Sequence, residues 1–174
     1  MKNSIKPILL LFMMALTISA CKKTDSTIIT ATGTAAVVTG QNFGFDGAAG
    51  VAFNSNTAAI VKVGTLVTIS AIQDGTSNAI KIVINNVTAA GTFVLDKDNT
   101  QGNGAIITKD NNKPTDNTLN YSTDNTSGVN KGSGQVKITS LTGTDAEGTF
   151  NIVAYNSAGK AATVSQGTFK GHIN

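Results

Sequence analysis

The strongest constraint on the fold of this chain is an alternation of apolar and polar residues that begins at Phe43 and recurs almost to the last residue. In residues 79–85, Ile80, Ile82 and Ile84 fall on one side of an extended chain, while polar residues fall on the other. Such alternation, rich in Ile, Val and Thr, is typical of half-buried antiparallel strands. No long helical period follows it, so the pattern predicts an all-β domain.

Turn residues separate the predicted strands. Residues 66–72 and 79–85 flank a Gln-Asp-Gly-Thr-Ser segment, and together they predict a β-hairpin. The last third of the chain predicts three further strands, over residues 135–141, 148–155 and 161–169. Several short strands joined by turns predict an antiparallel β-sandwich or an open barrel.

The tripeptide Gly-Thr-Phe occurs at residues 91–93, 148–150 and 167–169. We interpret it as one local device used three times, in which glycine permits a bend and phenylalanine enters the core. Large apolar residues on the inward phase of the strands form the predicted core: Phe53, Ile69, Ile82, Ile84, Phe93, Val136, Ile138, Phe150, Ile152 and Phe169.

The N-terminus has the features of a secretory signal peptide. Lys2 and Lys6 precede an apolar segment, residues 8–18, and small residues follow it directly before Cys21. Ile18-Ser19-Ala20-Cys21 resembles the lipobox of bacterial lipoproteins, which implies that Cys21 is acylated and that residues 1–20 are removed. Two or more acyl chains make membrane attachment stable. The alternative is an ordinary signal peptide with an incidental cysteine.

These signals divide the chain into three parts. Residues 1–20 are the predicted signal peptide, and residues 21–42 are the lipidated cysteine and a flexible tether of low complexity that ends in a short strand around residues 35–38. Residues 43–174 are the single predicted all-β domain. The mature chain of about 150 residues is long enough to bury roughly two-thirds of its unfolded surface without disulfides.

The charge of the mature chain argues against nucleic acid as a partner. The sequence has 13 basic and 10 acidic residues, but Lys2 and Lys6 belong to the signal peptide, so the mature chain is near neutral. Every basic residue is lysine, whereas arginine is favoured for bidentate contact with phosphate and guanine. The expected partners are therefore the membrane, through Cys21, and a protein of the cell envelope.

No catalytic constellation stands out, and we expect no enzymatic activity. Nucleophilic catalysis needs a base beside the nucleophile, and the single histidine, His172, is two residues from the end of the chain. Glycoside hydrolysis needs two positioned carboxylates, and Glu147 is the only glutamate. Once Cys21 is lipidated, His172 alone cannot form a zinc site.

Polar loops are the predicted place for any binding activity, namely residues 96–118 and 124–134. Asp96, Asp98 and Thr100 alternate in the first loop and predict hard oxygen ligands for calcium, although the run departs from the EF-hand pattern. The alternative is a solvated turn rich in Asp and Asn. Apart from calcium, no cofactor is expected.

Several segments resemble the small all-β lipoproteins of Bacteroidota-type bacteria, a family without a characterised activity. The segments are the lipobox, the early Phe-x-Phe at 43–45, Tyr121-Ser122-Thr123, and residues 134–141, 147–152 and 167–169. The resemblance implies an all-β fold and an envelope location, and it carries no catalytic or binding residues.

The expected function is therefore that of an anchored envelope lipoprotein that acts as a structural or protein-interaction module. The alternative is a ligand-binding module for glycans or calcium, although the chain has no Trp and only two Tyr to stack on sugar rings. Lys22 and Lys23 directly follow the cysteine, which favours the periplasmic face of the outer membrane over the cell surface. The oligomeric state is left open.

Overall fold

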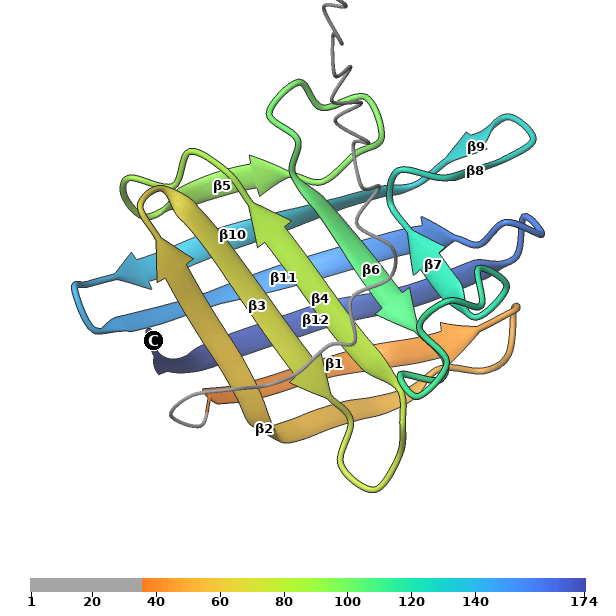
Figure 1. Ribbon diagram of the computed structural model, residues 1–174, viewed down its shortest axis with the longest axis horizontal. Coiled ribbons are helices and arrows are strands. Elements are labelled where there is room, and N and C mark those ends of the chain that lie inside the picture. The colour runs from red at the N-terminus through yellow and green to blue at the C-terminus, as the bar shows by residue number, and fades with distance from the viewer. Residues whose placement is uncertain (1–35) are drawn as a thin grey trace, which may run out of the picture.

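The computed structural model describes residues 36–174, which form twelve β-strands (Figure 1). The strands are β1 (Ala36–Phe45), β2 (Val51–Val63), β3 (Leu66–Ile72), β4 (Ala79–Ile84), β5 (Gly91–Val94), β6 (Gly104–Thr108), β7 (Asn120–Ser122), β8 (Thr126–Ser127), β9 (Asn130–Lys131), β10 (Ser133–Leu141), β11 (Asp145–Tyr155) and β12 (Ala161–His172). The described residues contain no helix that could cross a membrane.

Eight of the strands close on themselves in the order β12-β1-β2-β3-β4-β6-β7-β11, because β11 also pairs with β12. β10 and β5 extend the sheet from the other edge of β11, and β8 and β9 form a separate small ribbon. All the strand pairs are antiparallel. The closure between β7 and β11 is a single residue pair, Ser122 with Tyr155. The predicted all-β fold, in its open-barrel form, is confirmed.

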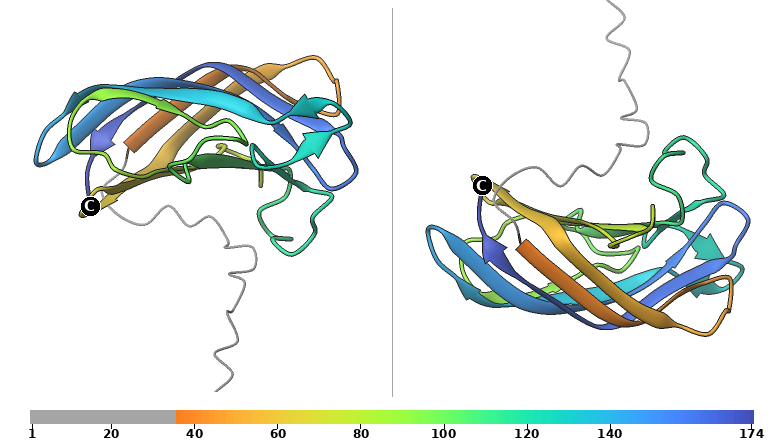
Figure 2. Two further views of the ribbon diagram at one scale, coloured as in Figure 1. Left: turned by 90° about the horizontal axis from the view of Figure 1, so that it is seen from above. Right: turned by 90° about the horizontal axis from the view of Figure 1, so that it is seen from below.

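The barrel is flattened into two layers, which Figure 2 shows from above and below. β2 belongs to both layers. Its first part, up to Ala58, pairs with β1, and its second part, from Ala59 to Val63, pairs with β3. A strand that changes partners in this way turns a corner between two crossing layers. The layer of β3, β4 and β6 therefore crosses the layer of β10, β11, β12 and β1 (Figure 1).

Inward-facing apolar side chains from both layers fill the interior. Nine of the ten predicted core residues are buried, and the exception is Phe93 on β5, which is partly exposed and packs against the edge of the core. β5 is the outermost strand beyond β10, where no second layer covers it completely. The predicted hairpin over residues 66–85 is confirmed as β3 and β4, in register from Val67 opposite Ile84 to Ile72 opposite Ala79.

Two of the three Gly-Thr-Phe tripeptides lie opposite each other, on β11 and β12. Gly148 pairs with Phe169, and Phe150 pairs with Gly167. A Cβ on Gly148 would lie 2.5 Å from the ring of Phe169, and a Cβ on Gly167 would lie 2.4 Å from the ring of Phe150. Each glycine therefore leaves the space that the ring of the facing strand occupies. The sequence interpretation that these glycines permit a bend is wrong for Gly148 and Gly167, because neither has a positive φ and each makes room for a ring instead.

A polar contact joins three segments at one end of the barrel. The hydroxyl of Tyr121, on β7, donates to Asp46 Oδ1 at 2.7 Å, and Lys109 Nζ lies 3.0 Å from Asp46 Oδ2. Phe45 packs against the ring of Tyr121 with the ring centroids 5.3 Å apart. Tyr121 is buried. The buried hydroxyl of Tyr121 is therefore satisfied by the carboxylate of Asp46.

β1 begins at Ala36, so residues 36–42 are part of the sheet, although the sequence places them in the tether. Ala36 lies opposite Ala58 of β2 and Gly171 of β12, and both Ala36 and Val38 are buried. The short strand expected around residues 35–38 is thus the start of a longer one. Thr, Gly and Gln within β1 lower its apolar content, which explains why the sequence resembles a linker.

Candidate functional site

β1, β11 and β12 all lose regular register at the same level of the sheet. Phe150 of β11 pairs with Gly167, and Ile152 pairs with Val164, so two residues of β12 share the place opposite Asn151. This is the arrangement of a β-bulge, which bends a strand and redirects its side chains.

The bulged backbone takes unusual conformations. Gln166 of β12 has φ of 48°, and Asn42 of β1 has φ of 50°. Positive φ is uncommon for residues other than glycine and costs conformational energy. Asn42 and Gln166 both line hollows on the outer surface of the sheet.

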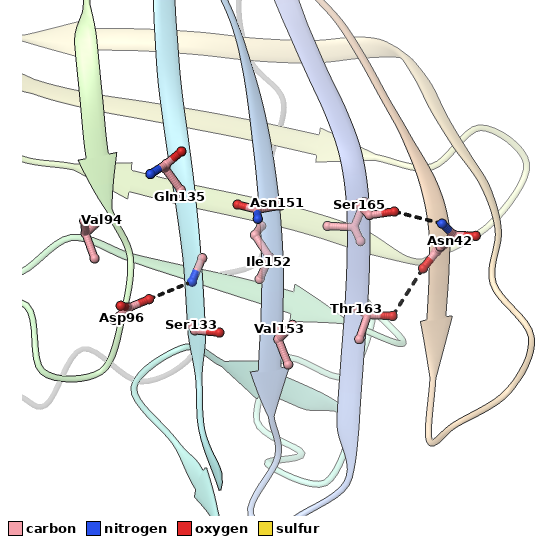
Figure 3. Close-up of a pocket in the computed structure, with 12 residues that line it drawn as sticks. Asn42, Val94, Asp96, Ser133, Gln135, Asn151, Ile152, Val153, Thr163 and Ser165 are labelled. Carbon is pink, nitrogen blue, oxygen red and sulfur yellow. Dashed lines mark hydrogen bonds between the residues drawn. The ribbon is translucent and has the colours of Figure 1, made fainter.

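A groove of about 520 Å³ crosses the outer face of the sheet at this level (Figure 3). Figure 3 shows that its side chains come from five neighbouring strands, and those that define its floor and walls are Val94, Gln135, Asn151, Thr163, Ser165 and Asn42. The groove is therefore built on the solvent side of the strands whose other side forms the core.

One wall of the groove is fixed by hydrogen bonds across β1 and β12. The Asn42 amide donates to Ser165 Oγ at 2.9 Å, and the Thr163 hydroxyl donates to the backbone carbonyl of Asn42 at 3.2 Å. The Ser165 hydroxyl in turn donates to the carbonyl of Gln41 at 3.3 Å. These bonds hold Asn42 in its strained conformation and give that wall a defined shape.

The floor carries two amides that remain uncommitted. Gln135 of β10 and Asn151 of β11 are cross-strand partners, and both are exposed. Within residues 36–174 neither side chain makes a hydrogen bond, and Figure 3 shows both amides without a bond to another residue of the groove. Val94, 44% exposed, lies opposite Gln135 on β5. The floor thus offers paired donors and acceptors beside a small apolar patch.

Two further hollows continue the groove on either side. One, of about 650 Å³, shares Asn42 and spreads over β1, β2 and the bulge at Gln166. The other, of about 290 Å³, shares Val94, Asp96 and Ser133 and includes the loop after β5. The three hollows together form a polar band across the outer face of the sheet from β5 to β2, which we call the outer-face groove.

Two of the three predicted calcium ligands, Asp96 and Asp98, line the smallest of these hollows, and each already has a partner. Asp96 Oδ1 accepts a hydrogen bond from the backbone N–H of Gly134 at 2.9 Å. Asp98 forms an ion pair with Lys131, whose hydrogen bond holds the pKa of Asp98 below its ordinary value. Thr100 is exposed further along the loop. In the described part of the chain no three His, Cys, Asp or Glu side chains form a metal-binding group.

A calcium site in this loop therefore stays a prediction. Calcium prefers six to eight oxygen ligands, and Lys131 at Asp98 Oδ2 would compete with the ion for that carboxylate. A calcium titration followed by the melting temperature tests it, with the Asp96→Asn/Asp98→Asn double variant as the control.

Most Asp and Asn side chains of the predicted binding loops hold the loops themselves. Asn103 is buried, accepts from the N–H of Asn85 at 2.8 Å and donates to the carbonyl of Val94 at 3.1 Å. Asp116, in the same predicted loop, accepts from the backbone N–H and the hydroxyl of Thr118 at 2.9 and 2.6 Å. The Asp and Asn residues of these loops therefore serve mainly to form hydrogen bonds with backbone N–H and C=O groups that have no strand partner.

The remaining candidates lie away from the groove. His172 ends β12, with Nδ1 3.4 Å from Asp145 Oδ1, and Glu147 pairs with Lys170 at 3.2 Å. Cys21, the predicted lipidation site, lies outside the described residues.

Sequence reasoning missed the groove because it assigned binding to the loops and treated the outer face of the strands as plain surface. The available signal was that the outward residues of these strands are amides and hydroxyls at the groove, whereas charged residues such as Lys137, Glu147 and Lys170 are exposed elsewhere on the same strands.

Taken together, the fold and the groove define an antiparallel barrel, extended by two strands, with a polar band across its outer face. Residues 44–171 match the model of the DUF6252 family, a domain of unknown function, and the chain belongs to that family. Neither a curated protein nor a solved structure matches it.

Proposed function

We propose that this protein is an envelope lipoprotein, anchored through Cys21, whose barrel is a binding module that engages an extended partner along the outer-face groove. The observation that supports the binding role is that the side-chain amides of Gln135 and Asn151 make no hydrogen bond within the described residues. Both lie on the floor of the groove, next to the bulged part of the sheet. Conformational strain that the surrounding hydrogen bonds maintain is typical of functional positions.

The anchor is supported by the lipobox and by the resemblance to lipoproteins of Bacteroidota-type bacteria. Lysines directly after the cysteine favour the periplasmic face of the outer membrane. Residues 22–35 separate Cys21 from the first strand, which is enough chain to lift the barrel off the bilayer.

Binding fits the chemistry of the groove better than catalysis does. Its lining is made mainly of amides, hydroxyls and small apolar groups, and Asp96 is the one ionisable residue of the central hollow. General acid–base catalysis uses groups that exchange protons near neutral pH, and amides do not. The strands, more than loops 96–118 and 124–134, therefore present the binding groups.

The anchor is tested by replacing Cys21 with Ala and separating soluble from membrane fractions. We expect the wild-type chain in the membrane fraction and the Cys21→Ala variant in the soluble fraction. A variant that stays in the membrane fraction after a high-salt wash would place the anchor elsewhere.

The binding role is tested by photo-crosslinking in intact cells with a probe that inserts into C–H bonds and therefore captures proteins and glycans alike, followed by identification of what is attached. We expect Asn151→Arg, which fills the groove, to remove the partner. Thr68→Arg, on the outer side of β3 in the other layer, is the matched control and should leave the partner attached. Identical crosslinking of both variants and the wild type would contradict the proposal.

A further inference from the structure

We propose that the partner of the outer-face groove is an uncharged polysaccharide, held through its hydroxyl groups. This inference rests on the proposed function and names the class of ligand that the groove would bind.

The charge of the groove points to a neutral ligand. Asp96 is the one charged residue of the central hollow, and its Oδ1 already accepts the N–H of Gly134. The hollow over β1 and β2 is lined by no charged residue. An acidic or phosphorylated ligand would need cations, and the two lysines of the third hollow are already engaged, Lys131 with Asp98 and Lys97 with the backbone carbonyl of Asp124.

The hydrogen-bonding groups of the floor suit hydroxyls. A side-chain amide presents both donors and an acceptor, and a sugar hydroxyl also donates and accepts. Gln135 and Asn151 stand on adjacent strands, which are spaced about 4.8 Å apart. The row continues to Ser165 on β12, so a ligand lying across the strands would meet polar groups at regular intervals.

Small apolar groups alternate with these polar ones. Val94 is 44% exposed in the central hollow, and Val51 is 59% exposed in the neighbouring one. Such groups can contact the C–H faces of sugar rings. The groove lining contains no aromatic residue. Affinity therefore has to come from several sugar units contacted together, and it should rise with the length of the glycan.

A peptide fits the same surface less well. Extended peptides gain affinity mainly by adding a strand to an open sheet edge. Under the central groove, β10, β11, β12 and β1 are paired on both sides, so their backbone groups are already used, and of the groove's strands only the four-residue β5 at the end of the sheet leaves one edge open.

The test is affinity electrophoresis of the soluble Cys21→Ala chain through native gels that contain a polysaccharide. The neutral polymers are dextran, a β-glucan, a mannan and a galactan, and alginate is the anionic comparison. We expect at least one neutral polymer to retard the protein. When oligosaccharides of that polymer are attached to a matrix, we expect longer oligosaccharides to retard the protein more than shorter ones.

The variant for this test is Gln135→Ala/Asn151→Ala, and the matched control is Asn130→Ala on the exposed ribbon β9. We expect the double variant to lose at least tenfold in apparent affinity and the control to bind like the wild type. Melting curves check that both variants are folded. Shifts of the side-chain amide NMR signals of Gln135 and Asn151 on adding oligosaccharide give an independent readout.

Retardation by no neutral polymer, by alginate alone, or to the same extent in the double variant would overturn the inference. If Asn151→Arg still removes a crosslinked protein from intact cells, the binding role stands and only the glycan is wrong. If the crosslinks are unaffected as well, both proposals fail.

Discussion

Positions 148 and 167 require glycine because the rings of Phe169 and Phe150 occupy the space that a Cβ atom would need. A Cβ at position 148 would also come within 2.3 Å of the carbonyl oxygen of Lys137, which is backbone and cannot move aside easily. Overpacking a core typically costs about 1–3 kcal/mol. We expect Gly148→Ala and Gly167→Ala each to lower the free energy of unfolding by at least this amount, measured by urea denaturation.

Gly91, in the third Gly-Thr-Phe, is the matched control for that prediction. The nearest atoms to a Cβ there are 3.7 Å away, an ordinary contact. Because alanine also reduces the entropy of the unfolded chain, Gly91→Ala should change stability by less than about 1 kcal/mol. Equal losses at all three positions would show that chain conformation, not the facing rings, sets the requirement for glycine.

The contact between Tyr121 and Asp46 makes stability depend on pH at both extremes. The hydrogen bond from Tyr121, with Lys109 beside it, holds the pKa of Asp46 below its ordinary value. Stability from this group is present above the unfolded pKa of about 3.9 and is lost as the pH falls through the lower folded pKa. Burial, and then Asp46, raise the pKa of Tyr121. Its contribution is full below about pH 10 and is lost at higher pH.

Urea denaturation of the wild type and of Tyr121→Phe between pH 3 and 11 measures both effects. We expect the variant to lose less stability than the wild type above pH 10 and to show a weaker acid dependence. Tyr155→Phe, which removes the other tyrosine hydroxyl, should keep the wild-type profile. Parallel profiles for Tyr121→Phe and the wild type would contradict the assignment.

At the scale of elements, Asn103 ties β4 to the end of β5 and the start of β6. It is buried and bonds the backbone of Asn85 and of Val94. Its removal leaves the partly buried N–H of Asn85 and the carbonyl of Val94 without this partner, and each lost hydrogen bond typically costs about 0.5–1.5 kcal/mol. Asn103→Ala should lower the free energy of unfolding by the sum of these two costs, while Asn112→Ala, at an exposed position in the turn that follows β6, should change it by less than about 0.5 kcal/mol. Equal effects would mean that the loop is held by other contacts.

The elements differ in how far the sequence could predict them. The β3–β4 hairpin and β10, β11 and β12 follow from alternation, since each has one clearly apolar face. β2 does not, because the polar run at residues 54–56 interrupts its pattern where the strand turns between the layers. β1 carries Thr, Gly and Gln over the bulge and therefore resembles a tether.

The groove could be predicted only in part. Alternation places Asn151 and Ser165 on the outer face, and their polar character follows from the sequence. The hollow itself depends on register shifts at Asn42 and Gln166, which adopt positive φ without being glycine. Register is set by pairing between distant strands, so no local run of residues encodes it.

For the whole molecule, the domain boundary can be measured directly. Residues 36–42 supply buried Ala36 and Val38 and much of the pairing that joins β2 to β12. We expect residues 36–174 to fold cooperatively and residues 43–174 to be much less stable or unfolded, as judged by thermal melting and NMR dispersion. Equal stability of the two would place residues 36–42 outside the cooperative unit.

The pairing of the first described strand with the last has a consequence for secretion. Ala36 lies opposite Gly171, so the barrel cannot close until almost the whole chain is available. Long-range strand pairing also makes folding slow compared with helical proteins of similar size. Under the proposed export, the polypeptide would emerge on the far side of the inner membrane from residue 36 onward and wait, without its closing strand, until the C-terminus follows. If the chain is exported as proposed, the barrel can complete itself only after β12 has also crossed the membrane.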